Sequence, residues 1–121
     1  MRAIALALLL ALPPLALAAG DPARGEKIYE RCAACHSLAV DRTGPHHCGL
    51  IGRPAGTVQG FEYSKAMKRS GIVWNERTLD RLLADPMKAV PGTSMGYAGI
   101  PEVGERRDLI AYLAHAGPCP R

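Results

Sequence analysis

The chain has 121 residues and a formal net charge of +4, with 15 lysines and arginines against 11 acidic residues. This length allows one domain at most. The mild positive charge excludes a nucleic-acid-binding footprint, because neither a basic run nor basic residues interleaved with aromatic ones accompany it.

The first 18 residues have the features of a cleaved secretory signal peptide. Arg2 makes the start positive, residues 3–12 are continuously apolar, and residues 16–18 (ALA) fit a small-x-small cleavage pattern. A membrane anchor would need about 20 apolar residues, and Pro13 and Pro14 interrupt the run too early. We therefore expect cleavage after Ala18, with Ala19 as the alternative, and residues 19–121 as one periplasmic domain without stable membrane insertion.

Helix signals follow in chain order. Asp21-Pro22 predicts a helix start, and this first helix should cover about 22–34. A long loop with many glycines and prolines leads to a short helix over 64–69. Asn75 or Glu76 should begin another helix, which Asp85-Pro86 ends, and the last helix should follow a second glycine-rich loop and cover about 103–116.

No segment alternates in the way that a half-buried strand does, so the predicted fold class is all-α. A few helices are joined by loops that are unusually long for a compact domain, and such loops need something to organise them. A bound ligand would do so.

The motif Cys32-Ala33-Ala34-Cys35-His36 has the C-x-x-C-H spacing of covalent c-type haem attachment. In this chemistry the two thiols add across the two haem vinyl groups, and the adjacent histidine binds the iron through a neutral nitrogen. We therefore expect one haem, attached through Cys32 and Cys35, with His36 as an iron ligand.

Three other interpretations of this motif are weaker. A thioredoxin-like redox pair would need a preceding strand in a βαβ unit. A zinc site could add His46, His47 or Cys48, but the chain lacks a second C-x-x-C pair. A disulfide between the two cysteines of the motif leaves its histidine unexplained.

A second iron ligand must come from elsewhere in the chain, and a methionine is the candidate. Met67 lies in the short helix and Met87 follows a helix stop, so both are interpreted as packing residues. Met95 lies in the loop 91–96 (PGTSMG), which can bring backbone close to a flat cofactor. Its thioether would close the sixth coordination position.

The chain resembles the class I cytochromes c, in the branch of mitochondrial cytochrome c and bacterial cytochrome c2. The segments that carry the resemblance occur in the expected order and extend from about Gly20 to Ala116. Besides the cysteine motif they are residues 43–45 (TGP), 48–53 (CGLIGR), 60–64 (GFEYS), 70–74 (SGIVW), 91–95 (PGTSM) and 108–113 (DLIAYL).

The resemblance implies haem c with His36 and Met95 as axial ligands. It also implies that the carbonyl of Pro45 accepts a hydrogen bond from the other ring nitrogen of His36, and that Thr93 orders the methionine loop. Three further residues should hydrogen-bond or screen a buried propionate, namely Arg53, Tyr63 and Trp74. The first and last helices should cross where Gly25 and Tyr29 meet Leu109 and Tyr112.

An iron with both axial positions filled has no site for substrate, so we expect an electron carrier and not an enzyme. The protein should be a monomeric shuttle whose partners are redox proteins, such as an oxidase, a bc1-type complex, a reaction centre or a periplasmic dehydrogenase. Two alternatives remain open. One is a dedicated haem subunit of a dehydrogenase, and the other is a sensor in which nitric oxide or carbon monoxide displaces Met95.

The sequence departs from the family at several positions. The family usually has an apolar residue at the position of His47, and often a tyrosine at that of Leu82. Lysines are common where this chain has Met87, Ser94, Pro101 and Glu102. We therefore expect a more apolar contact surface around the haem edge, with Met87, Pro101 and Tyr97 near it, unless arginines elsewhere restore the positive charge.

Two cysteines and three histidines lie outside the haem motif. Unused cysteines in an exported chain usually pair, so a Cys48–Cys119 disulfide is predicted. His46 and His47 are interpreted as exposed loop residues, and His115 as a solvated residue at the end of the last helix.

Overall fold

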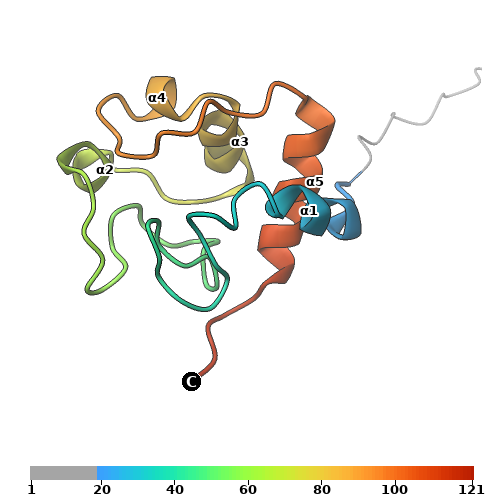
Figure 1. The fold of residues 1–121 in the computed structure, drawn as a ribbon, viewed down its shortest axis with the longest axis horizontal. Helices are drawn as coiled ribbons and strands as arrows, with labels where there is room; N and C mark the ends of the chain where they lie inside the picture. The colour runs from blue at the N-terminus through green and yellow to red at the C-terminus, as the bar shows by residue number, and fades with distance from the viewer. Residues whose placement is uncertain (1–18) are drawn as a thin grey trace, which may run out of the picture.

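The computed structural model describes residues 19–121, so the expected signal peptide lies outside the described residues. The described part contains five helices, α1 (Pro22–Tyr29), α2 (Lys65–Arg69), α3 (Glu76–Ala84), α4 (Pro86–Ala89) and α5 (Val103–His115) (Figure 1). It has no strand, and its one extended pairing is an isolated bridge between Pro54 and Val73. The all-α prediction is confirmed. Within residues 19–121, no helix combines the length and apolar character needed to cross a membrane.

The predicted helix starts carry the capping groups that the sequence indicated. The Asp21 carboxylate accepts hydrogen bonds from the backbone N–H groups of the next turn, and Pro22 occupies the first helical position. Ser64 caps α2 in the same way, and Asn75 and Thr78 form a reciprocal capping box at α3. Side-chain oxygens at these starts therefore satisfy backbone donors that the helices leave free.

One helix end differs from the prediction, and one short helix was not predicted. α1 ends at Tyr29 and not at Ala34, because the N–H groups of residues 31–33 bond to carbonyls three residues earlier, which tightens the chain into turns through the cysteine motif. The short helix α4 was not predicted. Asp85 ends α3, but its side chain also accepts a hydrogen bond from the N–H of Lys88 and so begins a new turn.

α1 crosses α5 at very short range (Figure 1). A Cβ added at Gly25 would lie 2.0 Å from the carbonyl oxygen of Asp108, so only glycine permits this approach. The Asp108 carboxylate accepts hydrogen bonds from the Asp21 N–H at 2.7 Å and from Arg24 Nε at 2.8 Å. Leu109 is completely buried at this crossing. The expected crossing of the first and last helices is confirmed.

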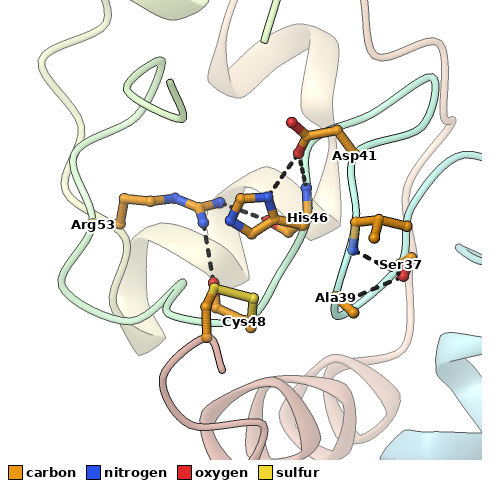
Figure 2. Close-up of a disulfide and its surroundings, with 8 residues drawn as sticks. Ser37, Ala39, Asp41, His46, Cys48 and Arg53 are labelled. Atoms are coloured by element: carbon orange, nitrogen blue, oxygen red, sulfur yellow. Dashed lines mark hydrogen bonds and ion pairs between the residues drawn. A yellow bond between two sulfur atoms is a disulfide. The ribbon is translucent and has the colours of Figure 1, made fainter. Parts of the chain in front are cut away.

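A disulfide joins Cys48 in the first long loop to Cys119 in the tail after α5, with the two Cα atoms 4.8 Å apart (Figure 2). The Gly49 N–H also donates a hydrogen bond to the Gly117 carbonyl at 2.7 Å. The C-terminal tail is therefore fastened to the loop that follows the cysteine motif.

Candidate haem-binding site

The loops and helices of the chain surround a cavity of about 380 Å³, which lies within the usual size range of ligand sites. Its walls are largely apolar, with leucines from α3 and α5. Every residue expected at the haem lines this cavity, namely Cys32, Cys35, His36, Pro45, Arg53, Tyr63, Trp74, Thr93 and Met95. Residues from four separate segments of the chain thus meet at one site.

The cysteine motif forms one wall. Cys32 is half-buried and Cys35 is exposed, and neither takes part in a disulfide. The His36 N–H donates to the Cys32 carbonyl at 2.9 Å, which folds the histidine back over its own motif. The two thiols and the imidazole are therefore held together by a single tight turn.

The His36 ring is fixed by its neighbours. Its Nδ1 lies 2.8 Å from the carbonyl oxygen of Pro45, and a carbonyl can only accept, so Nδ1 carries the proton. A Cβ added at Gly44 would lie 2.2 Å from Cε1 of the ring, so glycine is required there. Burial lowers the pKa of His36, which favours the neutral ring. The lone pair of Nε2 is thus left for a metal ion.

Met95 comes from the loop between α4 and α5. Its backbone N–H donates to Oγ1 of Thr93 at 3.2 Å, and the Thr93 N–H donates to the Val90 carbonyl at 2.9 Å. Thr93 is itself buried, so the loop is tied down where the methionine leaves it.

The two other methionines of the described chain differ from each other. Met67 is buried in the core and also lines the cavity, in agreement with its interpretation as a packing residue. The same interpretation was wrong for Met87, because its side chain on α4 is 53% exposed and does not line the cavity. A short helix that the sequence analysis missed turns this side chain outward.

Arg53 supplies a charged group to the cavity wall. Its guanidinium donates to the carbonyl of His46 at 2.9 Å and to that of Cys48 at 3.3 Å (Figure 2), and burial lowers its pKa. The Tyr63 hydroxyl accepts a hydrogen bond from the Val58 N–H at 3.1 Å, and Trp74 is buried. A fixed positive charge therefore lies beside two amphipathic aromatic side chains.

The interpretation of His46 and His47 as exposed loop residues was wrong. The His46 side chain is only 22% exposed, and its Nδ1 lies 2.7 Å from a carboxylate oxygen of Asp41 (Figure 2). His47 lines the cavity and stacks on His36, with ring centroids 4.2 Å apart. Its Nδ1 lies 3.0 Å from the Tyr29 hydroxyl, and burial lowers its pKa to about 3. His115, by contrast, is exposed at the last position of α5, as expected.

Sequence reasoning missed the contact between His47 and His36. The available signal was the position of His47, two residues after the Pro45 carbonyl that orients the other ring. An exposed loop is the ordinary expectation for consecutive histidines, and only the path of the loop around His36 reverses it.

A zinc site of the kind weighed from the sequence is disfavoured. The possible ligand atoms of His46, Cys48 and Cys119 lie within 4.8 Å of one another. However, the two sulfur atoms are joined in the disulfide and cannot act as thiolate ligands. Cys48 is therefore not free to complete a site with the cysteine motif.

The residues of the cavity fit a covalently attached haem. Free thiols, an imidazole with one unengaged nitrogen and a methionine thioether line the same largely apolar space. Nitrogen and thioether donors suit a haem iron, and apolar walls suit a flat hydrophobic ring. An arginine in the same cavity as the buried Trp74 and the half-buried Tyr63 suits a carboxylate at the edge of the haem.

Known proteins agree with this assignment. The family model described as "Cytochrome c" matches residues 22–117. Cytochrome c2 of Rhodomicrobium vannielii is 44% identical over 102 residues, which cover 82% of each chain. Cytochrome c of Chlamydomonas reinhardtii is 48% identical over 102 residues, covering 81% of this chain and 91% of that protein.

Comparison with solved structures also points to a cytochrome c. The solved structure of cytochrome cH from Methylobacterium extorquens has a TM-score of 0.78 and 42% identity, and the match covers 79% of this chain and 99% of that one. The chain therefore belongs to the cytochrome c family, in which it is a class I electron carrier with one covalently bound haem c.

Proposed function

We propose that this cytochrome is an exported shuttle for single electrons, with its haem attached through Cys32 and Cys35 and ligated by His36 and Met95. The observation that carries the proposal is that these four side chains line one cavity, in which the Pro45 carbonyl already engages Nδ1 of His36. When bound, the haem supplies a one-electron couple at its iron.

Residues around the cavity fix the positions of the two proposed iron ligands. Pro45 and Gly44 orient the His36 ring, and Thr93 holds the loop of Met95. Because such fixed ligands need little rearrangement between two charge states, they favour fast electron transfer. The apolar walls exclude water, and together with a thioether ligand they favour the less charged, reduced state.

Arg53, Tyr63 and Trp74 are assigned to a buried propionate. The guanidinium is oriented by the carbonyls of His46 and Cys48, which leaves its positive charge at the cavity. A carboxylate taken out of water requires such a partner. The Arg53→Gln variant should retain the covalent haem but show a lower reduction potential, because loss of the positive charge stabilises the oxidised state.

The assignment of the axial methionine is tested by absorption spectroscopy of the ferric holoprotein. The wild type should be low-spin and show the weak red band of a methionine–iron bond. Met95→Ala should abolish the band, whereas the control Met67→Ala removes the other methionine of the cavity and should retain it. A band that survives in Met95→Ala and is lost in Met67→Ala would reverse the assignment.

The sensor alternative requires an exchangeable sixth ligand. The wild-type ferrous protein should not bind carbon monoxide at neutral pH, because Thr93 and the buried Val90 hold the methionine loop in place. Stoichiometric binding of carbon monoxide under these conditions would favour a sensor.

Export and the free state of the protein are tested together in a periplasmic extract. The mature chain should begin at Ala19, or at Gly20 if the alternative cleavage site is used, and should elute as a monomer. A chain that keeps residues 1–18 and stays in the membrane fraction would contradict cleavage and the free state. Quantitative co-elution with a dehydrogenase would favour a dedicated haem subunit.

Docking is proposed to depend less on positive charge than in lysine-rich relatives. Arg31 is paired with Glu105 through hydrogen bonds of 2.7 and 2.9 Å, which offsets its charge. Met87 and Pro101, which the resemblance assigns to the contact surface, are exposed, and Tyr97 lines the cavity. Transient redox complexes generally form through small interfaces, for which a few exposed apolar side chains suffice.

The electron-transfer rate with the native redox partner, measured from low to high ionic strength, tests this surface. A shallow salt dependence is expected, with Met87→Glu slowing the reaction and Val40→Glu serving as the control on another exposed apolar side chain. A steep fall with salt would instead indicate that arginines steer the partner.

A further inference from the structure

The contact between His47 and His36 is a specific feature of the proposed ligand site. The ring centroids are 4.2 Å apart and the planes are inclined by 23°, which is a stacked arrangement. Pro45 and Gly44 hold His36 through their backbone, whereas His47 contacts it through a side chain. The properties of that side chain therefore act directly on the imidazole of His36.

His47 is itself held from two directions. Its backbone N–H donates to the Ser37 carbonyl at 3.0 Å, which places the residue against the chain that follows the cysteine motif. Its ring nitrogen Nδ1 lies 3.0 Å from the hydroxyl of Tyr29. The ring cannot turn away from His36 without breaking this hydrogen bond.

Tyr29 provides a rigid anchor for this hydrogen bond. It is the last residue of α1 and is buried, and its ring packs against that of Tyr112 on α5 with centroids 5.3 Å apart. Its ring also contacts the edge of His47, with centroids 5.7 Å apart and planes at 66°. A continuous series of contacts thus runs from the crossing of α1 and α5, through Tyr29 and His47, to His36.

We propose that Tyr29 and His47 are positioning residues, which set the plane of the His36 imidazole and make the environment on its side of the haem more polar. The proposal rests on the proposed function, in which His36 ligates the iron. The orientations of the axial ligands, the imidazole among them, determine how the unpaired electron of the ferric state is distributed over the haem ring. A polar neighbour stabilises the more highly charged ferric state, so His47 should lower the reduction potential relative to an apolar side chain of similar size.

The experiment compares the wild-type holoprotein with His47→Leu, Tyr29→Phe and the double variant. Leucine removes the polar ring and the stacking, while phenylalanine keeps the aromatic packing of Tyr29 and removes only its hydroxyl. His115→Leu is the matched control, because that histidine is exposed at the end of α5. Two properties are measured: the midpoint potential, and the haem methyl resonances in the proton NMR spectrum of the ferric protein.

His47→Leu should raise the midpoint potential and change the pattern of the methyl resonances. Tyr29→Phe should shift both properties in the same direction by a smaller amount, and His115→Leu should shift neither. If Tyr29 acts through His47, the double variant should match His47→Leu, because removing the hydroxyl has no further effect once its partner is gone.

Two results would overturn the proposal. If His47→Leu keeps a low-spin spectrum with unchanged potential and methyl resonances, His47 does not position His36, although ligation by His36 stands. If the two single substitutions shift the potential additively, Tyr29 does not act through His47. A wild-type ferric protein without a low-spin, six-coordinate spectrum would instead refute the proposed ligation itself, and this inference with it.

Discussion

Replacing Gly25 with alanine sets helix propensity against the packing of α1 on α5. Alanine is favoured over glycine in a helix interior by about 1 kcal/mol. At this position, however, the added Cβ would lie 2.0 Å from the Asp108 carbonyl oxygen and 2.7 Å from Cβ of Tyr112. Carbon atoms pack best at roughly 3.5–4.0 Å, so α1 must move away from α5.

The displacement of α1 determines how much stability Gly25→Ala loses. Overpacking of a tight contact costs roughly 1–3 kcal/mol, and the upper end applies because the obstructing atom belongs to the backbone. Displacing α1 also stretches the hydrogen bond from the Asp21 N–H to Asp108, now 2.7 Å, at a cost of about 1 kcal/mol. After the gain in helix propensity is subtracted, Gly25→Ala should destabilise the holoprotein by about 3 kcal/mol.

Guanidinium unfolding of the holoprotein, followed by far-UV circular dichroism, measures this loss. Gly104→Ala on α5 is the matched control, because a Cβ added there meets no atom within 4 Å. That variant should equal the wild type in stability or exceed it by up to about 1 kcal/mol. If Gly25→Ala proves as stable as Gly104→Ala, the close approach of the two helices is not what requires glycine.

Three further predictions concern other contacts. Thiol labelling of the unfolded, non-reduced holoprotein should find no reactive cysteine, and two reactive thiols in the wild type would contradict the pairing. Cys119→Ser should lower the free energy of unfolding by up to about 4 kcal/mol, because the bond to Cys48 spans 71 residues. The hydrogen bond from Arg24 lowers the pKa of Asp108, so its stabilisation is present above the unfolded pKa of about 3.9 and is lost as the pH falls through the lower folded value. Asp108→Asn should therefore be less stable than the wild type at pH 7, and a stability difference that persists at the most acidic pH would count against this linkage. Arg106→Met should lower the free energy of unfolding by about 2–4 kcal/mol in the same denaturant assay, because the buried side chain donates to the carbonyls of Ile100 and Pro101 at 2.8 and 2.9 Å. An unchanged unfolding midpoint would mean that water replaces the arginine as the donor to these carbonyls.

Local chemistry made most of the fold predictable. Asp21-Pro22 and Asn75 start helices because their side-chain oxygens cap free N–H groups, and this information is contained in a few adjacent residues. The early end of α1 was not predictable in the same way, since C-x-x-C-H continues a helical pattern and only the hydrogen bonds show the tighter turns. α4 was missed because Asp85 both ends one helix and caps the next.

The candidate site was also only partly predictable from local sequence. The cysteine motif is a local signal, and Met95 could be selected from its loop, but the roles of Arg53 and Pro45 came only from the resemblance to the family. The burial of His47 depends on packing against residues distant in the chain, whereas the exposure of Met87 follows from the short helix α4. The path of the loop past His36 is not encoded by the residues next to it, whereas the helix under Met87 begins at the local cap Asp85, which was interpreted only as a helix stop.

The tie between Cys48 and Cys119 also determines how the described chain would respond to mechanical tension. A force applied at residues 19 and 121 would pass along the backbone to Cys48, cross the two sulfur atoms to Cys119 and leave the intervening segment unloaded. The fully stretched protein would then measure about 115 Å, including the span across the disulfide, and not about 370 Å, at about 3.6 Å for each residue under load. Met95 lies inside the shielded segment, whereas Cys32, Cys35 and His36 lie on the loaded path. Tension would therefore reach the two walls of the cavity unequally.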